Sequence, residues 1–316
     1  LLNDSEVRTT QKTSYGVRAL AGAELELNNG LIDTQGNYSA GLSAGSATVI
    51  ARNLSVRTSG DDNAMGVVAD TGSTITLYGG SVTTSGNGSP VQSNLTFPHA
   101  LASRNQGAQL NAYGTSVQTL GSQAYGAAVD DGGSMLLEGL TVKTAGQYST
   151  GLYAGIGTLK PGQVSLTARN VSVETLGQQA AGALVSRQYQ TPTATLDLID
   201  STLTTRGQLS HGLQAESGAQ LSASNSAVGQ DDIFGASAIC MIGLHNAQGQ
   251  GVLRVIRQPG TRHAMLLGIP GSQGLHDHGL QVLQRTKVGV LQVLAGVPIH
   301  DRQRRHVGLR ERHAYR

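Results

Sequence analysis

The feature of this sequence that most restricts its fold is a five-residue motif that returns seven times. The motif is an apolar residue, any residue, Thr, any residue and Gly. It occurs at residues 32–36, 56–60, 82–86, 117–121, 142–146, 173–177 and 203–207, and successive copies are 24 to 35 residues apart. A repeat of roughly 20 to 50 residues is typical of solenoids, propellers and other arrays of stacked units.

Two further patterns recur between the copies of this motif. Gly, an apolar residue, any residue and Ala occur at residues 16–19, 41–44, 66–69, 151–154 and 212–215. Apolar residues alternate at 25–27, 75–77, 110–112, 196–198 and 221–223. All three patterns have a period of two, which predicts short β-strands, and the Gly, Asn and Asp between them suit tight turns. Each unit therefore contains three short strands, whereas a propeller blade has four in roughly 40 residues or more.

We expect an all-β fold, a right-handed parallel β-helix of about nine three-stranded coils. One unit cannot bury its apolar face, but stacked units can, because like positions form continuous columns. The first predicted inward column is Val17, Leu42, Val67, Leu101, Ala127, Leu152, Ala183 and Leu213. The second is Ile32, Val56, Val82, Val117, Val142, Val173 and Leu203.

The composition supports a packed core that is nearly free of aromatic residues. The hydrophobic content is 38%, but only 3% of residues are aromatic, and 43 of the 316 residues are Gly. Val, Leu, Ile, Ala and Thr are therefore expected to form the core. This apolar content excludes a wholly disordered chain, and the single cysteine, Cys240, excludes a disulfide framework. No apolar run approaches the roughly 18 residues of a membrane-spanning helix.

The composition changes near residue 230. Residues 231–316 contain 11 Lys and Arg against 5 Asp and Glu, a balance of +6, whereas residues 1–230 contain 11 against 15, a balance of −4. We expect a lead-in at 1–13, the β-helix at 14–240 and an irregular, non-repeat basic tail at 241–316 that is disordered or the product of a reading-frame shift. A small unrelated domain and a polyanion-binding arm are the other interpretations of this tail.

The three patterns together resemble the passenger domains of pertactin-like autotransporters of Gram-negative bacteria. The resemblance covers about residues 14–238. It implies a cell-surface rod, monomeric, made in a longer precursor with a signal peptide and an outer-membrane β-barrel. Neither element is visible in this sequence, which starts in polar residues and has no series of roughly 10-residue amphipathic strands. We therefore expect a truncated passenger fragment, or a degenerate gene product without activity.

No catalytic, cofactor-binding or metal-binding site is expected. Residues 41–45 read GLSAG, the string of a hydrolase nucleophile elbow, but other coils have different residues in place of Ser43. Ser43 is therefore interpreted as an outward strand residue. The run His276, Asp277, His278 is a possible metal cluster, but two His at positions i and i+2 with no third ligand are a weak signal. Cys240 is interpreted as an inert thiol.

A polysaccharide lyase or hydrolase is the alternative function, because parallel β-helices also host such enzymes. These reactions need paired carboxylates, or carboxylates beside Arg or Lys, on one face. The Asp pairs at 61–62 and 130–131 fall at corners, where Asp is a turn former. The outward positions of the first strand pattern contain no acid: Arg18, Ser43, Val68, Ala102, Ala128, Tyr153, Leu184 and Gln214.

Recognition is expected at loops that lengthen single coils. Residues 87–97, 155–163 and 186–193 are longer than the matching connections of other coils. Long loops on a rigid scaffold commonly carry binding residues, so we expect Lys160, Arg187 and Tyr189 to bind; a tolerated insertion is the other interpretation. The predicted function is an adhesin or virulence-associated rod at the bacterial surface, whose partner is a host-cell protein or glycan and not a nucleic acid.

Overall fold

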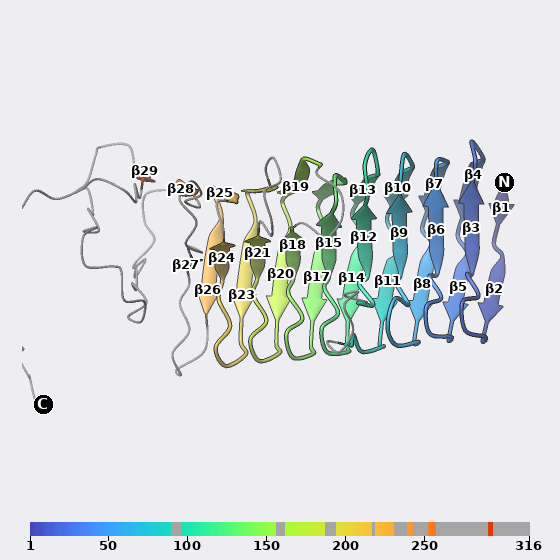
Figure 1. Cartoon of the computed structure of the whole chain (residues 1–316), viewed down its shortest axis with the longest axis horizontal. Coiled ribbons are helices and arrows are strands. Elements are labelled where there is room, and N and C mark those ends of the chain that lie inside the picture. Colours follow the sequence, from blue (N-terminus) through green and yellow to red (C-terminus); the bar gives the residue numbers. More distant parts are fainter. Residues whose placement is uncertain are drawn as a thin grey trace, which may run out of the picture.

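The computed structural model describes residues 1–89, 97–155, 162–186, 194–216 and 219–230, and the backbone of three later strands. Figure 1 shows a rod of stacked coils with the N-terminus at one end. Three parallel sheets form a right-handed β-helix of about eight turns, which confirms the predicted fold. Within the described ranges, no helical segment has the length and apolar character needed to cross a lipid bilayer.

Each coil contributes one strand to each of three sheets, here named A, B and C. Sheet A contains β1 (Leu2–Asn3), β4 (Glu24–Asn28), β7 (Thr48–Arg52), β10 (Thr74–Tyr78), β13 (Gln109–Tyr113), β16 (Ser134–Glu138), β19 (Val164–Arg169), β22 (Ala194–Ile199), β25 (Gln220–Ser224), β28 (Val252–Ile256) and β29 (Val290–Gln292). Sheet B contains β2 (Glu6–Thr9), β5 (Leu31–Thr34), β8 (Ser55–Thr58), β11 (Ser81–Thr84), β14 (Ser116–Thr119), β17 (Thr141–Thr144), β20 (Ser172–Thr175), β23 (Thr202–Thr205) and β26 (Ala227–Gln230). Sheet C contains β3 (Val17–Leu20), β6 (Leu42–Gly45), β9 (Val67–Asp70), β12 (Leu101–Arg104), β15 (Ala127–Asp130), β18 (Leu152–Ala154), β21 (Ala183–Ser186), β24 (Leu213–Glu216) and β27 (Ile239–Ile242).

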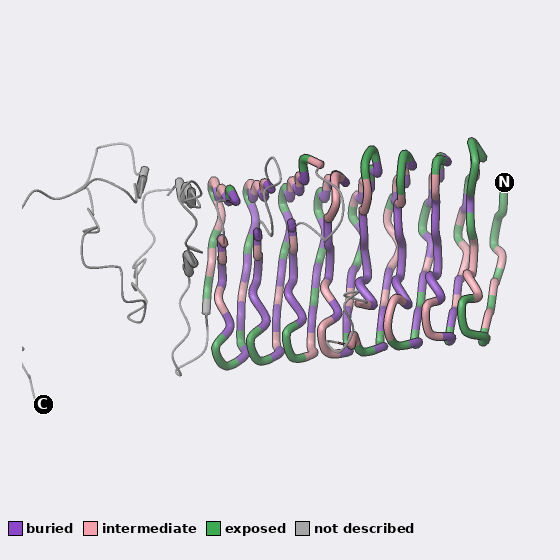
Figure 2. Tube along the Cα trace, viewed as in Figure 1, coloured by how far each residue is buried: buried purple, intermediate pink, exposed green. Residues whose placement is uncertain are grey.

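Both predicted inward columns are confirmed. In sheet C, Val67 pairs with Leu42 on one side and with Leu101 on the other. In sheet B, Val56 lies between Ile32 and Val82 in the same way. Apart from the partly buried Val17, no member of either column is more than 2% exposed. Buried segments run along the coils in Figure 2, except in the exposed coil at the N-terminus, so burial of aliphatic columns is the main force that holds the stack together.

The Gly of the five-residue motif closes the corner from sheet B to sheet C. A Cβ atom on Gly146 would lie 2.0 Å from the carbonyl oxygen of Gly121 in the preceding coil, and one on Gly60 would lie 2.1 Å from that of Gly36. The backbones of successive coils are thus stacked too closely for any side chain. This contact explains why Gly returns in every copy of the motif.

The corner from sheet A to sheet B depends on a left-handed residue. Asn29, Asn53 and Asn170 have φ angles of 52°, 51° and 50°, and Gly79 has 66° at the equivalent position. Asn and Gly adopt this conformation at lower cost than other residues. The Asn and Gly that the sequence places between its strand patterns are therefore fixed by backbone geometry.

The Thr of the motif has a role beyond its β-propensity. Its side chain points into the coil and is at most 2% exposed in all seven copies. In several coils its hydroxyl donates to the carbonyl oxygen five residues later, as from Thr144 to Ser149 at 2.6 Å and from Thr175 to Ala180 at 2.9 Å. The same residue therefore fills the core and ties down the following corner.

Strand pairing is also present in residues 1–13 and after residue 240. Residues 1–13, expected as a lead-in, contain β1 and β2, which pair in parallel with β4 and β5. After residue 240, β28 still pairs in parallel with β25, and the antiparallel strand β29 pairs with β28. Strand pairing needs only backbone groups and period-two side chains, so it continues where the five-residue motif is absent.

Candidate functional site

The binding residues predicted from the loops, Lys160, Arg187 and Tyr189, lie outside the described residues, as does the sequence at 276–278. Ser43 lies on β6 and is only 6% exposed. The polar groups and hollows of the described part that are suited to binding lie elsewhere. The richest of these regions is the outer face of sheet C together with the corner that leads into it.

A column of charged residues occupies the fourth position of three sheet C strands. Side chains alternate along a strand, so this position faces outward like the second one. Asp70, Arg104 and Asp130 pair in register there, and Arg104 Nη2 lies 3.0 Å from Asp70 Oδ2. The expectation of an acid-free outer face is thereby corrected. It considered only the second residue of each strand, and the same alternation would have revealed the fourth.

The two carboxyl groups of this column differ in acidity. Burial opposes ionisation of Asp70, but the Arg104 guanidinium and hydrogen bonds from Asn105 and Thr71 outweigh it and hold the pKa of Asp70 below its ordinary value. Burial, reinforced by the neighbouring Asp131, raises the pKa of Asp130 to about 7. Asp130 Oδ1 is buried and has no hydrogen-bond partner among the described residues. Asp70 is thus an anion at neutral pH, whereas Asp130 is close to half protonated.

Aromatic rings stack beside this column, along the same face. The rings of His99 and Tyr125 are nearly parallel, with centroids 4.7 Å apart, and Tyr153 continues the row at 5.1 Å from Tyr125. Phe97 lies 5.6 Å from His99. Burial lowers the pKa of His99 to about 3 and raises that of Tyr125 to about 12. The row is a neutral, packed structure that supports the outer face at neutral pH.

A groove opens over the N-terminal coils of the same face, and we call it the tyrosine groove. It has a volume of about 370 Å³, which is within the range of small-ligand sites. Its lining residues are Lys12, Thr13, Tyr15, Tyr38, Ala40, Asn63, Met65, Val68 and Arg104. The groove therefore combines aromatic rings, hydroxyl and amide groups, and two cations.

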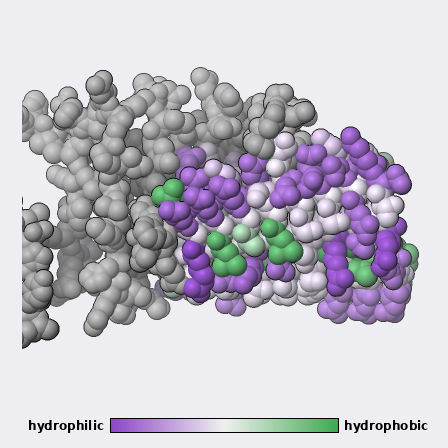
Figure 3. Space-filling view, turned by 90° about the horizontal axis from the view of Figure 1, so that it is seen from below, coloured by the Kyte–Doolittle hydropathy of each residue, from purple (hydrophilic) through white to green (hydrophobic). Residues whose placement is uncertain are grey.

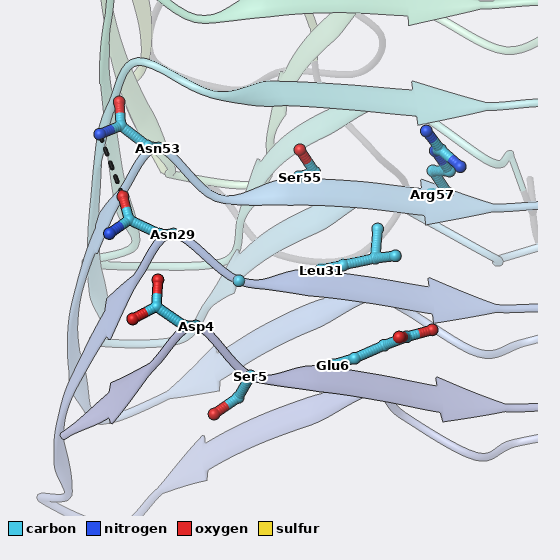
Figure 4. Close-up of a pocket in the computed structure, with 9 residues that line it drawn as sticks. Asp4, Ser5, Glu6, Asn29, Leu31, Asn53, Ser55 and Arg57 are labelled. Atoms are coloured by element: carbon cyan, nitrogen blue, oxygen red, sulfur yellow. Dashed lines mark hydrogen bonds between the residues drawn. The ribbon is translucent and has the colours of Figure 1, made fainter.

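A second hollow of about 520 Å³ lies at the corner between sheets A and B. Figure 4 shows Asp4, Glu6 and Arg57 around it, and a hydrogen bond from Asn53 Nδ2 to Asn29 Oδ1 at 3.3 Å. Asn29 and Asn53 are the left-handed corner residues described above. The fold alone thus explains these asparagines. The lining of the hollow contains the carboxylates of Asp4 and Glu6 and the guanidinium of Arg57, and it contains no aromatic ring.

The face of the rod drawn in Figure 3 carries mostly polar and neutral surface among its described residues. In Figure 3, seen from below the view of Figure 1, small apolar groups are separated by polar and neutral surface. Among the exposed large apolar residues, Leu1 and Leu2 are adjacent at the N-terminal end, whereas Leu120 and Leu209 lie in separate turns. Scattered exposed apolar residues are normal on protein surfaces. Within the described ranges, no group of three or more His, Cys, Asp or Glu side chains is arranged to hold a metal ion.

Comparison with known proteins adds no assignment. No family model, no curated protein and no solved structure matches this chain.

Proposed function

We propose that this chain forms part of a bacterial surface rod that binds its partner without chemical change, as the passenger of a pertactin-like autotransporter would. The observation that supports the proposal is the difference between the inward and the outward positions of each coil. The inward positions of sheet B are aliphatic or Thr in every strand from β5 to β23, whereas its outward positions, which are exposed or half-buried, change from Arg57 to Lys143 to Glu174. A rigid stack with a variable outer face is suited to recognition.

Surface location is tested on intact cells of the organism that encodes the chain. Antibodies raised against the folded full chain are expected to label intact cells, and external protease is expected to remove the signal. A signal that appears only after lysis would contradict the surface location. An intracellular protein of matched abundance, probed in the same samples, controls for leakage.

Adhesion is tested with the fluorescently labelled full chain on cultured host cells and on neighbouring bacteria. Saturable binding that excess unlabelled chain displaces is expected. Deletion of residues 156–161 and 187–193 separately tests the predicted contacts of Lys160, Arg187 and Tyr189. If those loops carry recognition, the deletion abolishes binding and leaves the β-sheet circular-dichroism signal unchanged. Binding that persists in the deletion variant would assign recognition to another surface.

The second candidate is a polysaccharide lyase or hydrolase, and the charged column on sheet C favours it. Adjacent strands lie ~4.8 Å apart, so the backbones at Asp70 and Asp130, two strands apart, are separated by on the order of 10 Å. An acid and a base of an inverting hydrolase lie roughly 6.5–9.5 Å apart. The test is release of reducing ends or unsaturated sugars from acidic polysaccharides by the full chain. Activity that Asp130→Asn removes would replace the adhesion proposal with an enzymatic function.

A further inference from the structure

The floor of the tyrosine groove is formed by apolar side chains that lie outside the coil. Val68 occupies an outward position of β9, yet it is 3% exposed, and Ala40 and Met65 are 3% and 5% exposed. With Ala102 and the partly buried Tyr15 they form a second apolar cluster, separate from the main core. Ala40 and Met65 belong to the turns before β6 and β9, which fold back over this face. The groove is therefore part of the packed structure.

Two cations lie against the tyrosine rings: Lys12, which lines the groove, and Arg18, which contacts the lining residue Tyr15. The Arg18 guanidinium lies over the Tyr15 ring, 4.5 Å from its centroid, and the Lys12 Nζ lies 5.1 Å from the centroid of the Tyr38 ring. Cations in this arrangement are oriented by the ring quadrupole and remain accessible to an anion. Arg18 and Lys12 are both exposed, and the structure shows no ion pair for either of them in its described part.

The charge of the groove is one-sided. Lys12 and Arg104 line it, and no carboxylate belongs to the lining. Asp70, which neighbours the lining residue Arg104, is already occupied by Arg104 and by hydrogen bonds from Asn105 and Thr71. The groove thus presents net positive charge to a ligand, beside the hydroxyl and amide groups of Thr13 and Asn63.

We propose that the tyrosine groove binds an acidic oligosaccharide, with Lys12 and Arg18 receiving the sugar carboxylate and with Tyr15 and Tyr38 packing against the sugar ring. Aromatic surface suits the C–H face of a pyranose, hydroxyl and amide groups suit its hydroxyls, and the cations select a sugar acid over a neutral sugar. The groove volume suits one or two sugar units. This inference rests on the proposed binding function and names its ligand class.

The test uses the purified full chain and isothermal titration calorimetry. The probe is a tetramer of galacturonic acid; a neutral galactose tetramer and a glutamate tetrapeptide are the comparison ligands. We expect the uronate to bind and the two comparison ligands not to bind. Added salt should weaken uronate binding, because salt screens exposed charges. The double variant Lys12→Gln, Arg18→Gln is expected to lose about tenfold in affinity, with an unchanged unfolding temperature because both side chains are exposed.

The chain offers a control on another face, an Arg that lies over a Tyr ring but is also paired with Glu26. Arg52 lies over the Tyr78 ring on sheet A, 5.7 Å from its centroid, and Tyr78 stacks on Tyr113 at 5.2 Å. Arg52→Gln is expected to leave uronate binding unchanged. If it weakens binding as much as the double variant does, the uronate binds to surface charge in general and the groove is not the site.

Two further outcomes would overturn the inference. Equal binding of the glutamate tetrapeptide would show that the groove recognises charge without sugar, and absence of uronate binding would remove the ligand class. Neither result bears on adhesion to cells, which is measured separately, so the failure of this inference can be distinguished from failure of the proposed function. Tyr15→Ala, matched by Tyr78→Ala, tests whether the ring contributes beyond the cations.

Discussion

Among single residues, the Thr column shows two ways in which a hydroxyl group is kept inside a coil. Thr144 and Thr119 occupy the same position of neighbouring coils, and both are 0% exposed. The Thr144 hydroxyl donates to the carbonyl oxygen of Ser149 at 2.6 Å, whereas Thr119 Oγ1 has no hydrogen-bond partner among the described residues. The pair therefore separates hydrogen bonding from packing at one site of the fold.

Thr144→Val is expected to lower the free energy of unfolding by about 1 kcal/mol, because the carbonyl of Ser149 loses its donor while the side-chain shape is kept. Thr119→Val is expected to be neutral or stabilising, because it removes a buried hydroxyl without a partner. Urea denaturation of both variants measures the difference. Equal effects would show that the hydrogen bond at Thr144 does not contribute to stability.

The pH dependence of stability is predicted to change with Asp130. Its folded-state pKa is about 7 and its ordinary value is 3.8. Between these values the folded chain holds the extra proton, so this group's contribution to stability is lost as pH rises from about 4 to about 7. Asp130→Asn removes this loss. The variant should therefore gain more in melting temperature, relative to the parent, at about pH 8 than at about pH 4.

His99 provides the opposite signature in the same measurements. Burial lowers its folded-state pKa from 6.5 to about 3. The unfolded chain therefore binds a proton that the folded chain does not, and stability falls as pH decreases through this window. The Asp130→Asn variant should still lose stability as the pH decreases through this window. If the melting temperature of the variant follows that of the parent at every pH, the loss of stability between about pH 4 and about pH 7 does not come from Asp130.

For strands and corners, the sequence predicts the features that repeat in every coil. It does not predict the features that arise only where a turn folds back over the outer face of a sheet. The two columns headed by Val17 and Ile32 follow from period-two alternation, and the structure stacks them as expected. The residue two places before each sheet C strand is different. Met65, His99 and Tyr125 turn onto the outer face there, and no periodicity indicates the direction of that turn.

The candidate groove was harder to predict than the fold for a related reason. Tyr15 and Tyr38 belong to two successive coils, and Arg104 comes from a later one. Their proximity depends on how corners of different length stack, which residue types alone do not specify. The column of Asp70, Arg104 and Asp130 was within reach of sequence reasoning, since it only requires alternation to be continued by one more outward position.

The glycine corner gives a prediction at this scale. Gly146→Ala would place a Cβ atom 2.0 Å from the carbonyl oxygen of Gly121, so adjacent coils would have to separate. We expect a loss of at least ~2 kcal/mol in unfolding free energy, or failure to fold. Gly45→Ala is the control, because its new Cβ atom would meet only the flexible Leu20 side chain, at 3.2 Å. Similar losses in both variants would contradict the close-stacking explanation.

Across the whole molecule, each coil contacts only its neighbours, so stability should depend on position along the rod. Leu166 and Leu25 occupy the same sheet A column, but Leu166 is 0% exposed in the middle and Leu25 is partly buried near the end. We expect Leu166→Ala to cost ~2–5 kcal/mol and Leu25→Ala clearly less. Chemical denaturation of the two variants measures this gradient, and equal losses would indicate a single global unit instead of a stack.

The stacking of one coil on the next also determines how the rod responds to a pull along its axis. The hydrogen bonds between strands of successive coils lie along that axis, while the covalent chain winds around it. Tension on the two ends should therefore unwind terminal coils one at a time. Each released coil of about 25 residues would add on the order of 80 Å of extended chain. A rod of this kind would lengthen in steps under tension and dissipate mechanical work before its last coil unfolds.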